Sequence, residues 1–192
     1  QGHRVVGPVY ARLPGELPEF LADLAAGPQP LVYFAMGSSG NRDLVLHVLA
    51  GLGRADCQVL APVRSHLRQE DLENLPRNVH VTDWLPAHQL GDAVDLAVTH
   101  GGEGTVQTSC VQGWPFIGIP LQFEQRFNVQ RCAAFGSARL MSQREARRTD
   151  WAELVRQALA DDGMRSRARR MAGLMEGLDG PGRAAEAICE LL

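Results

Sequence analysis

The segment THGGEGT, residues 99–105, holds the residue types best suited to binding an anion. Three glycines let the backbone turn tightly and approach a ligand closely. They are Gly101, Gly102 and Gly104. A helix that starts here favours a phosphate at its positive end, and His100 and Thr105 add side-chain donors. The alternative is a plain glycine-rich turn capped by Thr105, with His100 buried in the core.

A carboxylate and an amide stand together in the segment PLQFEQRFN, residues 120–128. Glu124 and Gln125 are expected just past a strand end, where the next helix begins. Such a pair can hold vicinal hydroxyls, because both groups accept hydrogen bonds and the amide also donates. The pair therefore indicates a sugar or ribose site. The alternative is an acid that only stabilises the helix N-terminus.

A tryptophan follows another predicted strand in the segment DWLP, residues 83–86. Pro86 makes this turn rigid, and the Trp84 indole is placed where it can stack on a nucleobase. The alternative is a tryptophan buried in the core.

Apolar runs alternate with helical patterns along the chain, and these elements must position the three segments. Strands are predicted at residues 31–36, 58–61, 79–82, 95–99, 116–120 and 138–141. Helices are predicted at residues 41–51, 65–71, 105–112, 125–135 and 150–159, with two more after residue 164 that are broken at residues 180–181. Strands that are apolar throughout are buried on both faces, and helical crossovers make neighbouring strands parallel. The prediction is an α/β, Rossmann-like open parallel sheet of about six strands with helices on both faces.

Ligands of such sheets bind at the carboxyl ends of the strands, and the unusual segments follow four of the predicted strands there. Ser38 follows the first predicted strand. Residues 1–18 are rich in proline and glycine and are expected to be a lead-in or interdomain linker, with residues 19–192 forming the domain. Because the first residue is Gln1, we expect the chain to be a piece of a longer protein.

Composition excludes several classes of function. The net charge of −3 disfavours a nucleic-acid-binding protein, and no apolar run is long enough for a transmembrane helix. All 19 basic residues are arginine, so lysine chemistry is excluded. The four cysteines form no CxxC pair, which predicts free thiols and a cytoplasmic protein. The histidines lack zinc-ligand spacing, so no metal is expected. No cofactor is expected either. Gln107 stands where a GxGxxG dinucleotide fingerprint needs glycine, which counts against an NAD(P) dehydrogenase.

Four motifs in this order, DWLP, HGGEGT, GWPFIGIP and EQRFN, resemble the donor-binding region of family 1 glycosyltransferases, which have the GT-B fold. The resemblance covers about residues 31–141 and is closest to the bacterial natural-product and antibiotic enzymes. In that family, two Rossmann-like halves face each other across a cleft. The C-terminal half holds the nucleotide sugar, and the N-terminal half holds the acceptor and the catalytic base. The resemblance implies that this chain is the C-terminal half.

The resemblance also implies roles for individual residues. Trp84 would stack on uracil or thymine beside Leu85, and His100 would stabilise the leaving group. The full set implied for the nucleotide and its phosphates is Ser38, Trp84, Leu85, His100, Gly101, Gly102, Gly104, Thr105 and Thr108. Glu124 and Gln125 would bind hydroxyls of the donor sugar. No catalytic base is expected in this chain.

Three departures from the family pattern bear on the donor. Glu124 replaces the usual aspartate, which moves the carboxylate and indicates a sugar other than glucose. Thr108 replaces the glutamate that holds the ribose in plant members. Glu103 and Gly104 replace a Trp-Asn pair of the plant enzymes, which favours bacterial enzymes that use TDP-deoxysugars.

The resemblance predicts an inverting glycosyltransferase that moves a sugar from UDP or TDP to a small lipophilic acceptor. This chain alone would bind the nucleotide and transfer nothing. Two alternatives stay open: a cell-wall N-acetylglucosaminyltransferase domain of the same fold, and a nucleotide-binding module without catalytic activity.

Overall fold

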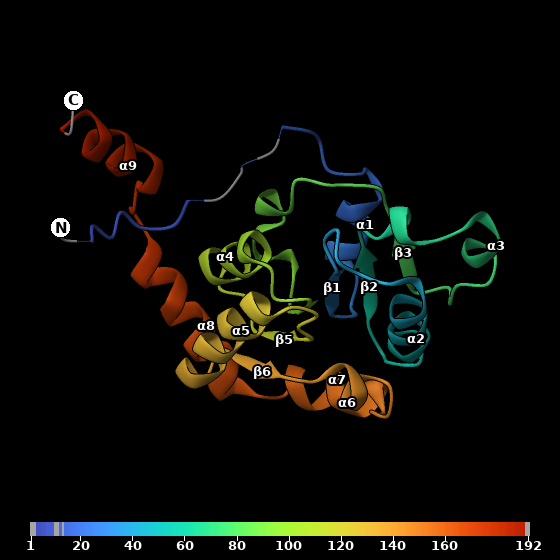
Figure 1. The fold of residues 1–192 in the computed structure, drawn as a ribbon. Coiled ribbons are helices and arrows are strands. Elements are labelled where there is room, and N and C mark those ends of the chain that lie inside the picture. Colours follow the sequence, from blue (N-terminus) through green and yellow to red (C-terminus); the bar gives the residue numbers. More distant parts are fainter. Residues whose placement is uncertain (1–2, 10–11, 13, 191–192) are drawn as a thin grey trace.

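The structure, a computed structural model, describes residues 3–9, 12 and 14–190 of the 192-residue chain. Its centre is a six-stranded parallel sheet with the order β3-β2-β1-β4-β5-β6 (Figure 1). The strands are β1 (Leu31–Ala35), β2 (Gln58–Ala61), β3 (Val79–Val81), β4 (Leu96–Thr99), β5 (Phe116–Gly118) and β6 (Ala138–Leu140). All six predicted strands are confirmed, five of them one or two residues shorter than predicted. The order reverses between β1 and β4, and open α/β sheets bind ligands at that point.

Helices cover both faces of the sheet, as predicted. They are α1 (Phe20–Ala26), α2 (Arg42–Leu52), α3 (Gln69–Leu72), α4 (Glu103–Gln112), α5 (Phe123–Phe135), α6 (Gln143–Ala146), α7 (Trp151–Leu159), α8 (Asp162–Met175) and α9 (Gly180–Cys189). Short 3-10 turns lie at Arg64–His66, Ala87–Gln89 and Gly91–Ala93. Helices α2 and α7 contribute to one apolar core cluster, and α1, α4 and α5 contribute to the other.

The sequence explains why α2 and α7 form and dock. The Asn41 side chain accepts a hydrogen bond from the Leu44 N–H at the start of α2, and Asp150 caps α7 in the same way. Val48, like the other inward residues of α2, is fully buried against the sheet. Trp151 of α7 is also fully buried, and it packs where Gly51 of α2 leaves room for its ring.

Several helix predictions were wrong in their bounds. The single polar helix expected at residues 65–71 is a 3-10 turn followed by the short α3, because the Arg68 N–H bonds the Asp71 carboxylate and starts a new helix there. Helices α4 and α5 each begin two residues earlier than predicted, so Gly102 rather than Thr105 is the N-cap of α4. Helices α1 and α6 were not predicted.

The described part of the lead-in contains no helix or strand, and residues 3–9 run beside α9 (Figure 1). Arg4 and Glu190 form an ion pair of 2.5 Å. The backbones meet closely at Gly180, where a Cβ would lie 2.1 Å from the Pro8 carbonyl oxygen. Only glycine permits this approach.

Candidate functional site

A cavity of about 600 Å³ opens at the carboxyl ends of β1, β2 and β4. It lies at the reversal of strand order. Six of the predicted nucleotide-site residues line it: Ser38, Trp84, Leu85, Gly104, Thr105 and Thr108. The structure therefore brings together residues from the turns after β1 and β3 and from α4, the helix that follows β4. Glu124, Gln125, His100, Gly101 and Gly102 are not part of this lining.

Trp84 lines the cavity with 53% of its surface exposed, so the alternative of a core tryptophan is wrong. Its ring edge lies against Gly15 of the lead-in, where a Cβ would come within 3.3 Å of Cζ3. Leu85 next to it is buried and anchors the turn. An exposed indole on a rigid turn is a ready surface for a flat aromatic ring.

His100 packs against the glycine turns that follow β1 and β4. A Cβ on Gly37 would lie 2.6 Å from its Nε2, and a Cβ on Gly102 would lie 2.4 Å from the same atom. Gly37 also has a φ of +53°, in the left-handed region. Two residues without side chains thus make room for one imidazole, and this is the packing reason for glycine at both positions.

The protonation of His100 follows from its surroundings. Its Nδ1 lies 3.4 Å from the carbonyl oxygen of Ala35, which can only accept a hydrogen bond. In the neutral ring, Nδ1 therefore carries the proton and Nε2 is free of one. Burial lowers the pKa of His100 below its ordinary value, while the Ala35 hydrogen bond and the charge of Glu124 act in the opposite direction. His100 is thus neutral at physiological pH.

The N-terminus of α4 faces the same cavity. Gly102 caps the helix in an extended conformation, and no atom would meet a Cβ on Gly104 within 4 Å. The first N–H groups of a helix have no partner within it, so they point a positive potential at this open space. Thr108 donates its hydroxyl to the Gly104 carbonyl at 2.8 Å, which leaves its oxygen able to accept from a ligand.

The two predicted sugar residues, Glu124 and Gln125, are already hydrogen-bonded within the chain. Gln125 is 3% exposed; its Oε1 accepts from the Leu121 N–H at 2.8 Å, and its Nε2 donates to Ser39 at 3.3 Å. Glu124 is exposed and accepts a hydrogen bond from Asn128. Asn128 also donates to the Gly101 carbonyl at 3.1 Å, so Glu124 is tied to the glycine turn. The cap of α5 is Gln122 with Gln125, so Glu124 is not the capping residue.

The turn after β2 forms a wall of the cavity, which was not predicted from the sequence. Arg64 and Ser65 line the cavity, as do Tyr33 and His88. The sequence prediction considered the ends of four strands and omitted the end of β2, where Pro62 directly follows the last strand residue. His66 joins this wall to the turn after β1, because its Nε2 donates to the Gly37 carbonyl at 2.7 Å.

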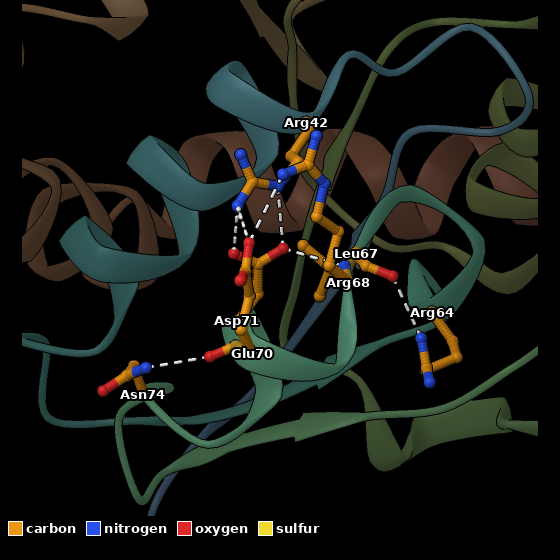
Figure 2. Close-up of polar contacts among 7 residues, drawn as sticks. All are labelled: Arg42, Arg64, Leu67, Arg68, Glu70, Asp71 and Asn74. Atoms are coloured by element: carbon orange, nitrogen blue, oxygen red, sulfur yellow. Dashed lines mark hydrogen bonds and ion pairs between the residues drawn. The ribbon is translucent and has the colours of Figure 1, made fainter.

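An ion pair holds the same wall in place (Figure 2). Arg42 at the start of α2 binds the Asp71 carboxylate with two hydrogen bonds, from Nε at 2.8 Å and from Nη2 at 2.5 Å. Asp71 also accepts from the Arg68 N–H at 2.8 Å, and Arg64 donates to the Leu67 carbonyl at 3.0 Å. The Arg42 guanidinium lowers the pKa of Asp71. The segment from Arg64 to α3 is thereby fixed against α2.

Within the described ranges, no group of three or more His, Cys, Asp or Glu side chains is arranged to hold a metal ion. In the same part of the chain, no helix combines the length and the apolar character that crossing a membrane requires.

Residues 46–191 match the protein family described as erythromycin biosynthesis protein CIII-like, C-terminal domain. The chain belongs to this family. A relative from Mycobacterium tuberculosis, the PGL/p-HBAD biosynthesis glycosyltransferase, is 30% identical over 172 residues, covering 88% of this chain and 39% of its own. The 3-alpha-mycarosylerythronolide B desosaminyl transferase of Saccharopolyspora erythraea is 26% identical, covering 100% of this chain and 46% of its own. The chain therefore spans less than half of the length of either relative.

Solved structures share the fold of this chain. The spinosyn rhamnosyltransferase SpnG complexed with thymidine diphosphate superposes with a TM-score of 0.77 at 21% identity, covering 96% of this chain and 51% of its own. The calicheamicin glycosyltransferase CalG4 superposes with a TM-score of 0.78 at 24% identity, covering 95% of this chain and 45% of its own. The predicted fold, the C-terminal half of a GT-B glycosyltransferase, is confirmed.

Proposed function

We propose that this chain is the nucleotide-sugar-binding half of an inverting glycosyltransferase, which transfers a sugar from TDP or UDP to a small lipophilic acceptor in the cytoplasm. The observation that carries the proposal is the cavity at the strand reversal, which is lined both by the exposed Trp84 and by the first turn of α4. An aromatic platform and an anion site in one cavity match a nucleoside diphosphate. A TDP-bound neighbour of the same fold supports this choice.

Each group has a role that follows from its chemistry. Trp84 stacks on the pyrimidine above Leu85, and Thr108 accepts a hydrogen bond from the ribose. The diphosphate lies against Ser38, His100, Gly101, Gly102, Gly104 and Thr105. Glu124 and Gln125 bind hydroxyls of the sugar. The exposed Glu124 carboxylate can accept from them while it keeps Asn128, because its two oxygens accept several hydrogen bonds.

Transfer with inversion requires the acceptor hydroxyl to attack the anomeric carbon from the face opposite the diphosphate. Negative charge then develops on the leaving diphosphate oxygen, beside the N-terminus of α4. Fixed backbone N–H groups stabilise that charge without reorganising during the reaction. A base in the other half of the enzyme removes the acceptor proton. Donation from His100 Nε2 to a phosphate requires the ring to take up a proton, because Nδ1 already faces Ala35.

Calorimetry with TDP, UDP and NAD tests nucleotide binding by this chain. We expect TDP or UDP to bind and NAD not to bind. Tight binding of NAD with no affinity for either pyrimidine diphosphate would overturn the proposal. The full-length enzyme should transfer a sugar, whereas a non-catalytic module would bind TDP in both forms and transfer nothing.

The sugar role has a matched control within the chain. Glu124 and Glu103 each lie in the first turn of a helix and each accept from an amide four residues later. In the full-length enzyme, Glu124→Gln should lower kcat/KM about tenfold or more, since a hydrogen bond to a charged group contributes about 1.5–3 kcal/mol. Affinity for TDP should change by less than about twofold. Glu103→Gln should leave transfer unchanged. Equal losses in TDP affinity and in transfer would place Glu124 on the nucleotide instead.

A further inference from the structure

Two cysteines meet between the helices that begin at the candidate site. Cys110 of α4 and Cys132 of α5 lie with their Sγ atoms 3.8 Å apart, in contact as a thiol pair. Both side chains are buried, with 6% and 7% of their surface exposed. The other two cysteines lie elsewhere, since Cys57 belongs to the core on the opposite face of the sheet and Cys189 is exposed on α9.

A second cavity, of about 530 Å³, gives small molecules a route to this pair. It lies among α4, α5 and α8, and both cysteines line it. Gln107 lines it as well, and the Oε1 atom of Gln107 is buried without a hydrogen-bond partner among the described residues. A buried acceptor of this kind needs a donor. Gln107 and Cys110 are three residues apart on α4, so the acceptor and the thiol share one face of the helix.

We propose that Cys110 and Cys132 form a reversible disulfide when a small hydroperoxide enters this second cavity, so that α4 and α5 become covalently joined. The O–H of the peroxide matches the unpaired Gln107 acceptor, and the two thiols stand at contact distance. The inference does not depend on the proposed transferase function, because it rests on the second cavity alone.

The reaction balances with the hydroperoxide as oxidant. The Cys132 thiolate attacks one peroxide oxygen, the O–O bond breaks, and the leaving oxygen departs as water or an alcohol, which leaves a sulfenic acid on Cys132. The Cys110 thiolate then attacks that sulfur and releases water. The two thiols lose two electrons and two protons, and the peroxide gains them. Cys132 reacts first, because the hydrogen bond from Cys110 lowers the pKa of Cys132.

Oxidation would covalently join α4 and α5, the two helices whose N-termini lie at the candidate site. The first turn of α4 follows the glycine turn, and the first turn of α5 carries Glu124. In the reduced protein the hydrogen bond from Asn128 to the Gly101 carbonyl joins α5 to the glycine turn before α4. A disulfide farther along both helices would add a covalent link and limit the movement of one helix against the other.

Peptide mapping tests the proposal on the 192-residue chain. The protein is treated with hydrogen peroxide, free thiols are alkylated, and the protein is digested with trypsin. Arg126 and Arg131 lie between the two cysteines, so trypsin releases Cys110 and Cys132 on separate peptides. We expect a cross-linked peptide pair, two hydrogen atoms lighter than the sum of its parts, which dithiothreitol separates. The melting temperature should rise on oxidation and return on reduction.

Variants identify the partners. Cys110→Ala and Cys132→Ala should each abolish the cross-link and the rise in melting temperature, while Cys57→Ala and Cys189→Ala should leave both unchanged. Gln107→Leu should slow formation of the cross-link severalfold. Wild-type protein in which peroxide produces only sulfinic acid, or only disulfides that involve Cys57 or Cys189, would overturn the proposal. The wild-type measurement decides the question even where a variant folds poorly.

Discussion

The proposed nucleoside end and sugar end of the candidate site differ in how free their side chains are to contact a ligand. At the nucleoside end, Trp84 stands half exposed beside an open cavity of about 600 Å³. At the sugar end, Gln125 is buried with its amide hydrogen-bonded, and Glu124 is bonded to Asn128. A ligand can contact Trp84 without displacing protein contacts, whereas at the second end it meets polar groups that already have a protein partner. Under the proposed function, the nucleoside therefore meets an exposed surface, and the sugar uses the hydrogen-bonding capacity that these contacts leave.

A substitution in the glycine turns should cause the largest loss of TDP affinity. Gly102→Ala places a Cβ 2.4 Å from His100 Nε2, and the ring cannot retreat because Gly37 lies close to the same atom. Overpacking of this kind costs about 1–3 kcal/mol of folding stability. The glycine turn must shift to relieve it, so we also expect TDP affinity measured by calorimetry to fall about tenfold or more. Gly173→Ala in α8 is the control, because its Cβ would meet no atom within 4 Å. Unchanged TDP affinity in Gly102→Ala would show that the glycine turn does not hold the diphosphate.

Substitutions of two tryptophans should separate an effect on TDP binding from an effect on folding stability. Trp84→Ala should weaken TDP binding by about 1–3 kcal/mol, the usual range for stacking on a base, with almost no change in the free energy of unfolding. Trp114→Ala should instead lower the free energy of unfolding and leave TDP binding almost unchanged. Trp114 is 2% exposed and donates to the Gly91 carbonyl at 2.8 Å, so its loss should cost about 3–5 kcal/mol of stability. Urea unfolding and TDP titration measure the two effects. A large loss of stability in Trp84→Ala would contradict this separation.

The ion pair behind the cavity wall should matter for the nucleoside end and little elsewhere. Asp71→Asn removes the carboxylate that accepts from both Arg42 and the Arg68 N–H. We expect a lower melting temperature and weaker TDP binding, because Arg64 and its neighbours would no longer be fixed. Glu70→Gln is the control, since Glu70 is exposed and lies 3.4 Å from Arg42. Equal effects of the two variants would mean that the buried pair does not position the wall.

The buried His100 predicts a smaller, pH-dependent effect on stability. Its pKa is lowered by burial, so its stabilising contribution is complete above the ordinary histidine pKa. As the pH falls, the unfolded chain binds a proton first, and stability is lost until the pH reaches the lowered pKa of the folded state. Melting temperature should therefore fall as the pH drops through the ordinary histidine pKa of about 6.5, and less steeply in His100→Gln. His80, whose pKa burial also lowers, leaves a residual slope. An identical slope in His100→Gln would show that its pKa is not lowered.

The strands were predictable because runs such as residues 31–35 are apolar without interruption, which only a strand buried on both faces explains. The partners of the polar side chains were not predictable. Gln125 has the residue type of a sugar ligand, yet its hydrogen bonds are fixed by where Ser39 lies in space. Arg64 gives no motif in the sequence and enters the cavity only because the turn after β2 is held by contacts with α2 and α3. Spacing along the chain predicts which residues reach an edge of the sheet, and tertiary packing decides what each one bonds there.

The contact between the lead-in and α9 has a consequence for the connectivity of the chain. Arg4 and Glu190 lie at 2.5 Å, although they are nearly the full length of the sequence apart. A short linker from Glu190 to Arg4 would close the chain into a ring. The ring could then be reopened at the exposed turn between α7 and α8. Every strand pairing would survive this circular permutation, because the order of the sheet depends on the crossovers and not on where the chain starts.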